Sequence, residues 1–508
     1  MRFVFRRTLS LVLLFNLCII HTSCDKDNEL NALLFTFIEE GNLEKVKYCL
    51  SQGAKLTAKY DNGATPLHMA ILYDQAEVAK FLIQEGAEIE AKDKYGYRPI
   101  HLASVLNNLT MAQILISNNA KLEVRNKNGY MPLHIAAVYG ATDVAQTLIN
   151  AGVAVDIRDV ELIGFLPHGE KPKKSDYRGS TPLHQAAYAN QVKMVELLIG
   201  LGADVNVKDN NGNCPLHYAT MNGKWEASEI LLKYGADIQA RNFKDTTPLH
   251  NAAYWGHALV VEKLIEQGAD VMVRDHVSNT PLHQVISANI ELADAIKVIQ
   301  ILIRKGAPLE ARNYQDFTPL HEAILFHKHK QAIVELLMEN GADIMAIDKR
   351  YNTSLHFAVI TGNIEIIKLL VKKGAYLEAK NLEGATPLYY ALERGRKNET
   401  LIQFLLRIGA KANTSNNNGD TPLHLAAKDD NLVINKLLVE AGANVNTQNN
   451  EGETPLFLAA FGNRWQKDIK VVRFLITKGA LNLPNNQGQY ADNFIEDTAL
   501  KRMLKKSE

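Results

Sequence analysis

The sequence predicts an all-α fold, a solenoid of stacked helix-turn-helix units that carry protruding β-hairpin loops. Two observations predict it. A stretch that contains a tetrapeptide of the form Thr-Pro-Leu-His recurs from about residue 61 to residue 485, and the residues between the tetrapeptides repeat the apolar pattern of two short helices. Such short repeats cannot bury their apolar faces alone, so each must pack against its neighbours.

The tetrapeptide occurs in twelve related copies. Intact copies begin at Thr65, Thr181, Thr247, Thr280, Thr318 and Thr421. Altered copies begin at Arg98, Met131, Cys214, Thr353, Thr386 and Thr454. The steps from 65 to 98, 98 to 131, 181 to 214, 214 to 247 and 247 to 280 are each 33 residues long. A period this regular indicates one kind of structural unit, repeated.

The repeat from 247 to 279 shows the task of each residue type. Thr247 is a typical helix N-cap, and Pro248 suits the first helical position, where a missing N–H costs nothing. The first helix is short, and its small Ala252 and Ala253 allow a neighbouring helix to approach closely.

A second helix is expected from Ala258 to Gln267, because Val260, Val261 and Leu264 would share one apolar face. Gly268 ends it, since glycine accepts the left-handed conformation common at helix C-termini. The polar residues that follow are expected to form the hairpin loop that leads into the next copy.

The motif and its period resemble those of ankyrin repeats, over almost all of the chain after its first 24 residues. The resemblance implies a protein without catalytic activity, whose concave face and hairpin loops bind another protein or an extended peptide. It also implies a structural role for the motif histidine. These histidines are His68, His101, His134, His184, His217, His250, His283, His321, His356 and His424.

A column of histidines also suggests a metal site, but the spacing argues against one. Neighbouring copies would lie a full helix layer apart, roughly 8 to 10 Å, whereas two ligands of one zinc ion are about 4 Å apart. His327 and His329 form a lone H-x-H in a helix connection, which is more typical of a solvated loop. We therefore expect no metal and no cofactor.

Residues 1–24 predict a signal peptide, because three arginines precede an apolar run from Leu9 to Ile20 that is short for a membrane span. An uncleaved anchor or an ordinary buried helix is the alternative. Ser23-Cys24 resembles the junction of a bacterial lipoprotein, in which Cys24 would carry lipid and tether the chain to a membrane. Cleavage near Cys24 and release is the other possibility. The protein is thus expected to be exported, as a membrane-anchored lipoprotein or in secreted or periplasmic form.

The rest of the chain divides into a capping repeat at 29–60, twelve repeats at 61–485 and a C-terminal capping helix within 486–508. The step from Met131 to Thr181 is 50 residues, which places a 17-residue insertion at about 160–176 in a hairpin loop. Two interpretations remain open, a partner-contacting loop and a tolerated surface insertion. Smaller insertions near 290–295, 327–330, 396–399 and 463–467 are expected to lengthen the connections between paired helices.

Composition excludes several functions. Lys plus Arg number 56 and Asp plus Glu number 56, a balance that argues against binding nucleic acid. Sequence motifs of hydrolases, zinc proteases and phosphate-binding loops are absent, so we expect no enzyme. Cys49 and Cys214 lie five repeats apart, beyond the roughly 7 Å that a disulfide allows, and are expected to stay unpaired.

The candidate binding positions are the two residues that lie four and five places after each motif histidine, which in ankyrin proteins vary on the concave face. Apolar and aromatic side chains dominate them in the first two-thirds of the chain, and such side chains anchor protein interfaces. The alternative is that they pack against the next repeat. The expected contact residues are Tyr73, Tyr139, Tyr188, Met221, Tyr254, Trp255 and Phe326.

These observations favour a monomeric, non-enzymatic scaffold that binds a partner protein or extended peptide. Three alternatives remain: a structural spacer or membrane-tethered scaffold, a secreted effector, and an inhibitor that changes the activity of a partner enzyme.

Overall fold

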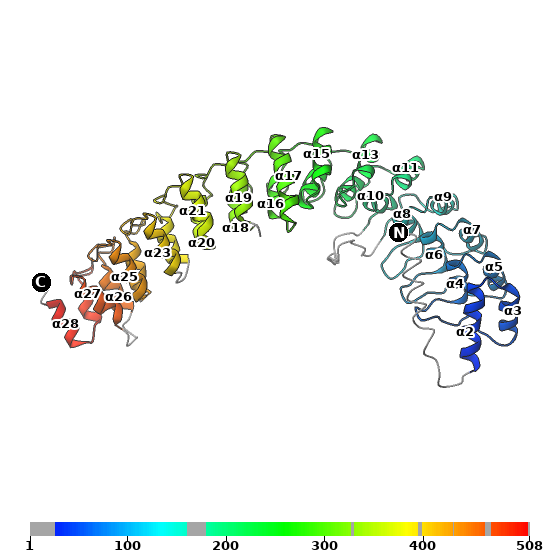
Figure 1. Ribbon diagram of the computed structural model, residues 1–508, viewed down its shortest axis with the longest axis horizontal. Coiled ribbons are helices and arrows are strands. Elements are labelled where there is room, and N and C mark those ends of the chain that lie inside the picture. Colours follow the sequence, from blue (N-terminus) through cyan, green and yellow to red (C-terminus); the bar gives the residue numbers. More distant parts are fainter. Residues whose placement is uncertain are drawn as a thin grey trace. The chain divides into compact units, whose positions relative to one another are not determined.

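The computed structural model describes residues 26–159, 179–326, 330–394, 399–429, 431–462 and 469–505. The expected signal peptide with Cys24, the insertion at 160–176 and most of the inserted residues near 327–330, 396–399 and 463–467 lie outside them. The described residues fold into pairs of short antiparallel helices, and their only β pairing is one bridge between Ile347 and Thr353 (Figure 1). The prediction of an all-α helix-turn-helix solenoid is confirmed.

Twelve first helices begin directly after the capping residue of the tetrapeptide. They are α4 (Pro66–Leu72), α6 (Pro99–Leu106), α8 (Pro132–Tyr139), α10 (Pro182–Tyr188), α12 (Pro215–Thr220), α14 (Pro248–Tyr254), α16 (Pro281–Ser287), α18 (Pro319–Leu325), α20 (Ser354–Thr361), α22 (Pro387–Arg394), α24 (Pro422–Lys428) and α26 (Pro455–Gly462).

Each first helix is followed by a second helix. These are α5 (Ala76–Gln84), α7 (Leu109–Ser117), α9 (Thr142–Asn150), α11 (Val192–Gly200), α13 (Trp225–Lys233), α15 (Ala258–Glu266), α17 (Leu292–Arg304), α19 (Lys330–Glu339), α21 (Ile364–Lys372), α23 (Glu399–Arg407), α25 (Leu432–Glu440) and α27 (Lys470–Thr477).

Helices without the tetrapeptide stand at both ends of the described repeats. At the N-terminal end, α2 (Lys26–Glu39) packs against α3 (Leu43–Ser51) and α4. At the C-terminal end, α26 packs against η1 (Ala491–Phe494), and α27 packs against α28 (Thr498–Lys505). Both ends therefore cover the face of a repeat that has no further neighbour.

Residue contacts divide the chain into two lobes. The N-terminal lobe comprises Met1–Ala219 and Glu226–Asp237, and the C-terminal lobe comprises Thr220–Trp225 and Ile238–Glu508. Within each lobe, successive first helices pack against one another, as α6 does on α8 and α14 does on α16. Each lobe thus has one continuous core that is built from consecutive repeats.

The core follows the repeat pattern. In the pair α14 and α15, Leu249, Ala252 and Ala253 are buried on the first helix, and Val260, Val261 and Leu264 are fully buried on the second. The small alanines let α14 and α16 approach closely, which accounts for their position in the sequence. Gly268 follows the helix with a φ of 96°, in the left-handed region that glycine accepts at a helix C-terminus.

The insertion near 290–295 differs from the prediction. Only its first residues lie in the connection, because α17 already begins at Leu292 and runs for 13 residues, against 9 in α15. Ala295 is fully buried on its inner face. The extra residues add a turn of helix in which Ala295 is buried and Leu292 is partly buried, and this burial favours helix over a longer loop.

Candidate functional site

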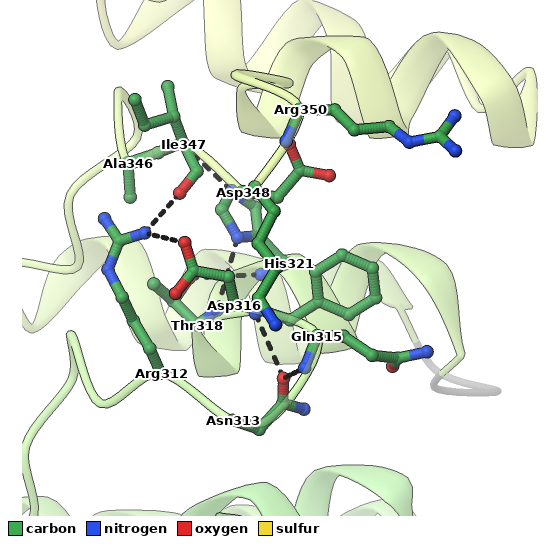
Figure 2. A network of polar contacts seen from close by, with 12 residues as sticks. Arg312, Asn313, Gln315, Asp316, Thr318, His321, Ala346, Ile347, Asp348 and Arg350 are labelled. Atoms are coloured by element: carbon green, nitrogen blue, oxygen red, sulfur yellow. Dashed lines mark hydrogen bonds and ion pairs between the residues drawn. The ribbon is translucent and has the colours of Figure 1, made fainter.

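The motif histidine joins each first helix to the hairpin loop of the next repeat. In α18, the Nδ1 atom of His321 accepts a hydrogen bond from the backbone N–H of Thr318, 3.2 Å away. An accepting Nδ1 leaves the proton on Nε2, which donates to the carbonyl oxygen of Ala346 at 3.0 Å (Figure 2). His250 makes the same pair of contacts, with Thr247 and with the carbonyl oxygen of Asn279.

These histidines are fully buried, and burial disfavours the charged imidazolium. It lowers the pKa of His101, His134, His184, His283 and His321 to about 4. The imidazoles are therefore neutral at pH 7 and serve as structural links between repeats. In the described residues, no group of His, Cys, Asp and Glu side chains is arranged to hold a metal ion.

The hairpin loops are tight turns held by an Asn or Asp side chain. Asn313 Oδ1 accepts hydrogen bonds from the N–H groups of Gln315 at 3.0 Å and Phe317 at 3.1 Å (Figure 2). Arg312 pairs with Asp316 at 2.8 Å and also donates to the carbonyl oxygen of Ile347 in the next loop. Each loop is therefore fixed to the loop beside it.

Further hydrogen bonds fix the ends of the first helices, where the candidate contact residues lie. Gln191 Nε2 donates to the carbonyl oxygen of Val138 at 3.0 Å. His257 Nε2 donates to the carbonyl oxygen of Met221 at 2.9 Å. The side chains at these ends are consequently displayed from a rigid backbone.

The structure leaves all seven candidate contact residues at least partly accessible. Tyr139 is 40% exposed, Tyr254 43% and Phe326 60%, whereas Tyr73, Tyr188, Met221 and Trp255 are half-buried. Tyr73, Tyr139 and Tyr188 belong to the N-terminal lobe, and the other four belong to the C-terminal lobe. The alternative, that these side chains are hidden in packing between repeats, does not describe Tyr139, Tyr254 and Phe326.

Two of the candidate residues touch each other. The rings of Tyr254 and Trp255 meet edge to face, with centroids 5.6 Å apart. Burial raises the pKa of Tyr139 and Tyr188, so both phenols stay protonated at neutral pH. The helix ends thus offer neutral aromatic surface with hydroxyl donors, which is the chemistry of interface anchors.

Sequence reasoning missed a second set of accessible apolar side chains, at the tips of the hairpin loops. Tyr95 is 63% exposed, Phe243 73%, Tyr314 72%, Tyr351 50% and Leu382 54%. These residues could have been found in the sequence, because each is an apolar residue within a turn, where small and polar residues are favoured.

Cys49 and Cys214 do not pair with each other, as expected from their separation, and both thiols are buried. Cys214 occupies the capping position of the motif threonine, and its Sγ lies 3.1 Å from Nδ1 of His217. No helix in the described part of the chain has the length and apolar character that crossing a membrane requires.

Comparison with known proteins agrees with this architecture. The family model of ankyrin repeats (three copies) matches seven overlapping segments: 6–93, 86–159, 153–242, 183–275, 249–348, 330–413 and 395–486. An ankyrin repeat protein of fowlpox virus is 45% identical over 71 residues, 13% of this chain and 14% of that protein.

Two further relatives match similarly short stretches. NF-kappa-B inhibitor alpha of Gallus gallus is 32% identical over 74 residues, 14% of this chain and 23% of the relative. The Notch-regulated ankyrin repeat-containing protein of Xenopus tropicalis is 33% identical over 74 residues, 15% of this chain and 65% of the relative. This chain thus matches less than two thirds of the length of each relative. With its repeats matched along almost their whole extent and their paired helices present in the described residues, the chain belongs to the ankyrin repeat family.

Proposed function

We propose that this chain is a non-catalytic scaffold that binds a partner protein through the ends of its first helices and its hairpin loops. Ankyrin repeats imply protein–protein interaction, and the family is generally non-catalytic. The observation that carries the finer proposal is the exposure of Tyr139, Tyr254 and Phe326 at the ends of helices whose remaining apolar residues are buried.

Rigidity of the display supports this function. Binding costs the ordering of side chains and loops, and the cost is small where the backbone is already fixed. Tyr254 and Trp255 support each other by their ring contact, and His257 holds the carbonyl oxygen of Met221 in the same lobe. Aromatic anchors of this kind contribute about 2 kcal/mol or more each when a partner buries them.

The test compares partner capture by one double variant, one single variant and a control. The immobilised wild-type chain is used to isolate bound proteins, which are identified by mass spectrometry. Tyr254→Ser/Trp255→Ser should lose the specific partner while circular dichroism and the urea midpoint stay unchanged. Phe326→Ser, at a more exposed position, should weaken capture in the same way.

Tyr376→Ser provides the matched control, because Tyr376 is 58% exposed but lies in the loop after α21, away from the first-helix ends. It should leave capture intact. Equal loss in the control, or undiminished capture by the Tyr254 and Trp255 variant, would refute the proposed surface. Unfolding of the double variant would assign these rings to the core, and Phe326→Ser would then decide the question.

We propose in addition that the chain is exported. The support is the sequence pattern of residues 1–24, with arginines ahead of the apolar run from Leu9 to Ile20 and Ser23 before Cys24. Fatty-acid labelling of the wild type and of Cys24→Ala tests the lipid tether, with labelling expected only in the wild type. Fractionation tests export itself, and a chain retained with full length inside the producing cell would contradict it.

A further inference from the structure

Four consecutive hairpin loops of the C-terminal lobe form one surface, defined here as the loop-tip ridge: residues 241–246, 274–279, 312–317 and 347–352. Each loop exposes one apolar side chain at its tip. Phe243 is 73% exposed, Val277 36%, Tyr314 72% and Tyr351 50%. A row of exposed apolar side chains on one lobe is a typical mark of an interaction site.

Hydrogen bonds between neighbouring tips make the ridge continuous. The backbone N–H of His276 donates to the carbonyl oxygen of Lys244 at 3.0 Å. The backbone N–H of Tyr314 donates to the carbonyl oxygen of Val277 at 2.8 Å. Lys349 Nζ donates to the carbonyl oxygen of Tyr314 and lies 4.7 Å from the centre of its ring. The four apolar side chains are therefore held in a fixed order along connected backbone.

The fifth residue of each six-residue loop distinguishes these four loops from the others, because it is not glycine in any of the four. It has a positive φ in every loop and is glycine in the other described loops: Gly63, Gly96, Gly129, Gly179, Gly212, Gly384, Gly419, Gly452 and Gly488. In the ridge it is Asp245, Ser278, Asp316 and Tyr351, with φ of 54°, 62°, 66° and 57°.

A side chain with a Cβ is strained in that conformation, and a bulky one such as tyrosine especially so. Strain of this kind persists where the side chain serves a function. Apolar side chains are also exposed in loops that keep the glycine, at Tyr95 and Leu382, but the replacement of glycine occurs in all four ridge loops and in no other described loop.

The free charge of the ridge is positive. Its loops contain six Lys or Arg residues and four Asp residues. Asp275 and Asp348 are buried, Asp245 lies 3.8 Å from Arg241, and Asp316 lies 2.8 Å from Arg312. Lys244 and Arg350 are exposed, and the guanidinium of Arg350 extends away from the other labelled side chains (Figure 2).

We propose that the loop-tip ridge binds an extended acidic segment of a partner protein that carries apolar side chains between its carboxylates. The acidic groups would meet Lys244 and Arg350, and the apolar ones would pack against Phe243, Tyr314 and Tyr351. Repeats about 8 to 10 Å apart place the outer tips roughly 24 to 30 Å from each other, which eight or nine extended residues span.

This inference rests on the proposed scaffold function and deepens it by naming the chemistry of the partner. Basic and aromatic side chains together also suit single-stranded nucleic acid. A protein is favoured because the whole chain has equal numbers of acidic and basic residues and belongs to a family that binds proteins.

The experiment measures fluorescence anisotropy of a labelled 12-residue peptide with alternating glutamate and phenylalanine. The full chain should bind it, with affinity falling as salt rises. A lysine and phenylalanine peptide and a 12-nucleotide oligothymidine are the comparison probes, and both should bind at least ten-fold more weakly. Equal or tighter binding of either, or no binding of the acidic peptide, would overturn the proposal.

Variants then locate the site. Lys244→Glu/Arg350→Glu and Phe243→Ser/Tyr314→Ser should each weaken the acidic peptide about ten-fold. Asn418→Glu/Gln487→Glu is the matched control, because it places the same charges at the tips of later loops outside the ridge, and it should leave the affinity unchanged. Equal affinities in ridge and control variants would overturn the assignment.

Tyr351→Gly separates function from folding. Glycine relieves the positive φ, so the urea midpoint should rise while peptide affinity falls. A variant that is both more stable and equally tight would remove Tyr351 from the site. Capture of a natural partner that depends on Tyr254 and Trp255 but not on the ridge would leave the scaffold function standing and refute this inference alone.

Discussion

The side chain of Glu310 accepts a hydrogen bond from the backbone N–H of Asp343 in the next repeat, at 2.7 Å from its Oε1. Equivalent bonds run from the N–H of Lys121 to Glu90 and from that of Lys411 to Glu378. In these three repeats a glutamate, four residues after the glycine that follows the second helix, thus accepts a hydrogen bond from the backbone of the next repeat.

Two repeats of the C-terminal lobe place a methionine at this position, Met272 and Met345, exposed by 58% and 39%. Met345→Glu should restore a hydrogen bond to the N–H of Tyr376 and stabilise the protein by about 0.5 to 1 kcal/mol. Met272→Glu is the control, since the corresponding residue of the next repeat is Pro308, which has no N–H. Urea midpoints measure both, and an equal gain from the two variants would contradict the explanation.

Stability should fall as the pH drops below neutrality. Burial lowers the pKa of five motif histidines, among them His101 and His321, to about 4 in the folded protein, whereas histidine titrates near 6.5 in an unfolded chain. The unfolded state therefore binds more protons between these values, so the stabilisation is complete above pH 6.5 and is lost as the pH falls towards 4.

At pH 5.5 the loss is on the order of 1 kcal/mol for each such histidine. Denaturation in urea at pH 7.5 and pH 5.5 measures it, with a much lower midpoint expected at pH 5.5. The same midpoint at both pH values would show that these imidazoles are not held neutral by the fold.

Glu322 is expected to oppose this trend, because its contribution to stability falls as the pH rises from about 4.5 through 7. It is 6% exposed, its Oε1 accepts a hydrogen bond from Asn313 at 2.7 Å, and its Oε2 is buried without a partner. Burial, and then the charge of Asp275, raises its pKa to about 7 despite the hydrogen bond from Asn313. The stability that it contributes is complete below about pH 4.5 and is lost as the pH rises through 7.

Glu322→Gln should therefore stabilise the protein by up to about 3 kcal/mol at pH 8, and by about 1 kcal/mol at pH 5.5. Glutamine already stands at the same position in α16, where Gln284 donates to Asp275 at 2.8 Å. Urea titrations at the two pH values test this prediction. If the substitution raised the stability equally at both pH values, the ionised carboxylate of Glu322 would not be the group that destabilises the folded protein.

Cys49 and Cys214 should be unreactive in the folded protein. Both are 1% exposed, and burial raises the pKa of both thiols, which disfavours the reactive thiolate. In a chain with Cys18 and Cys24 replaced by serine, a thiol reagent such as DTNB should label two groups only after addition of urea. Rapid labelling under native conditions would show that the repeats around them open locally.

Most of the fold could be predicted from the sequence because the repeat encodes its structure locally. Thr247 and Pro248 begin a helix, Gly268 follows the end of the next one, and Ala252 and Ala253 mark where helices meet. The structural role of His250 follows from its regular recurrence. The start of α17 at Leu292 was not foreseen, because whether inserted residues extend a helix depends on the apolar surface that can cover them.

The candidate site was predicted less completely. The exposure of Tyr139, Tyr254 and Phe326 could be expected, because their distance from the motif histidine places them at a helix end; their role in binding stays a prediction. Phe243, Tyr314 and Tyr351 were not, because loop length and polarity alone do not show which side chains of a turn point to solvent.

The sequence by itself determined the length of the repeat, its two helices, its caps and its histidine, since each depends on residues a few positions apart. Only the tertiary structure decided which loop tips join into a ridge, which of their charges are already paired and where a contact between repeats is missing. Those properties depend on side chains about 30 to 40 residues apart in sequence, whose distances are set by the packing of one repeat on the next.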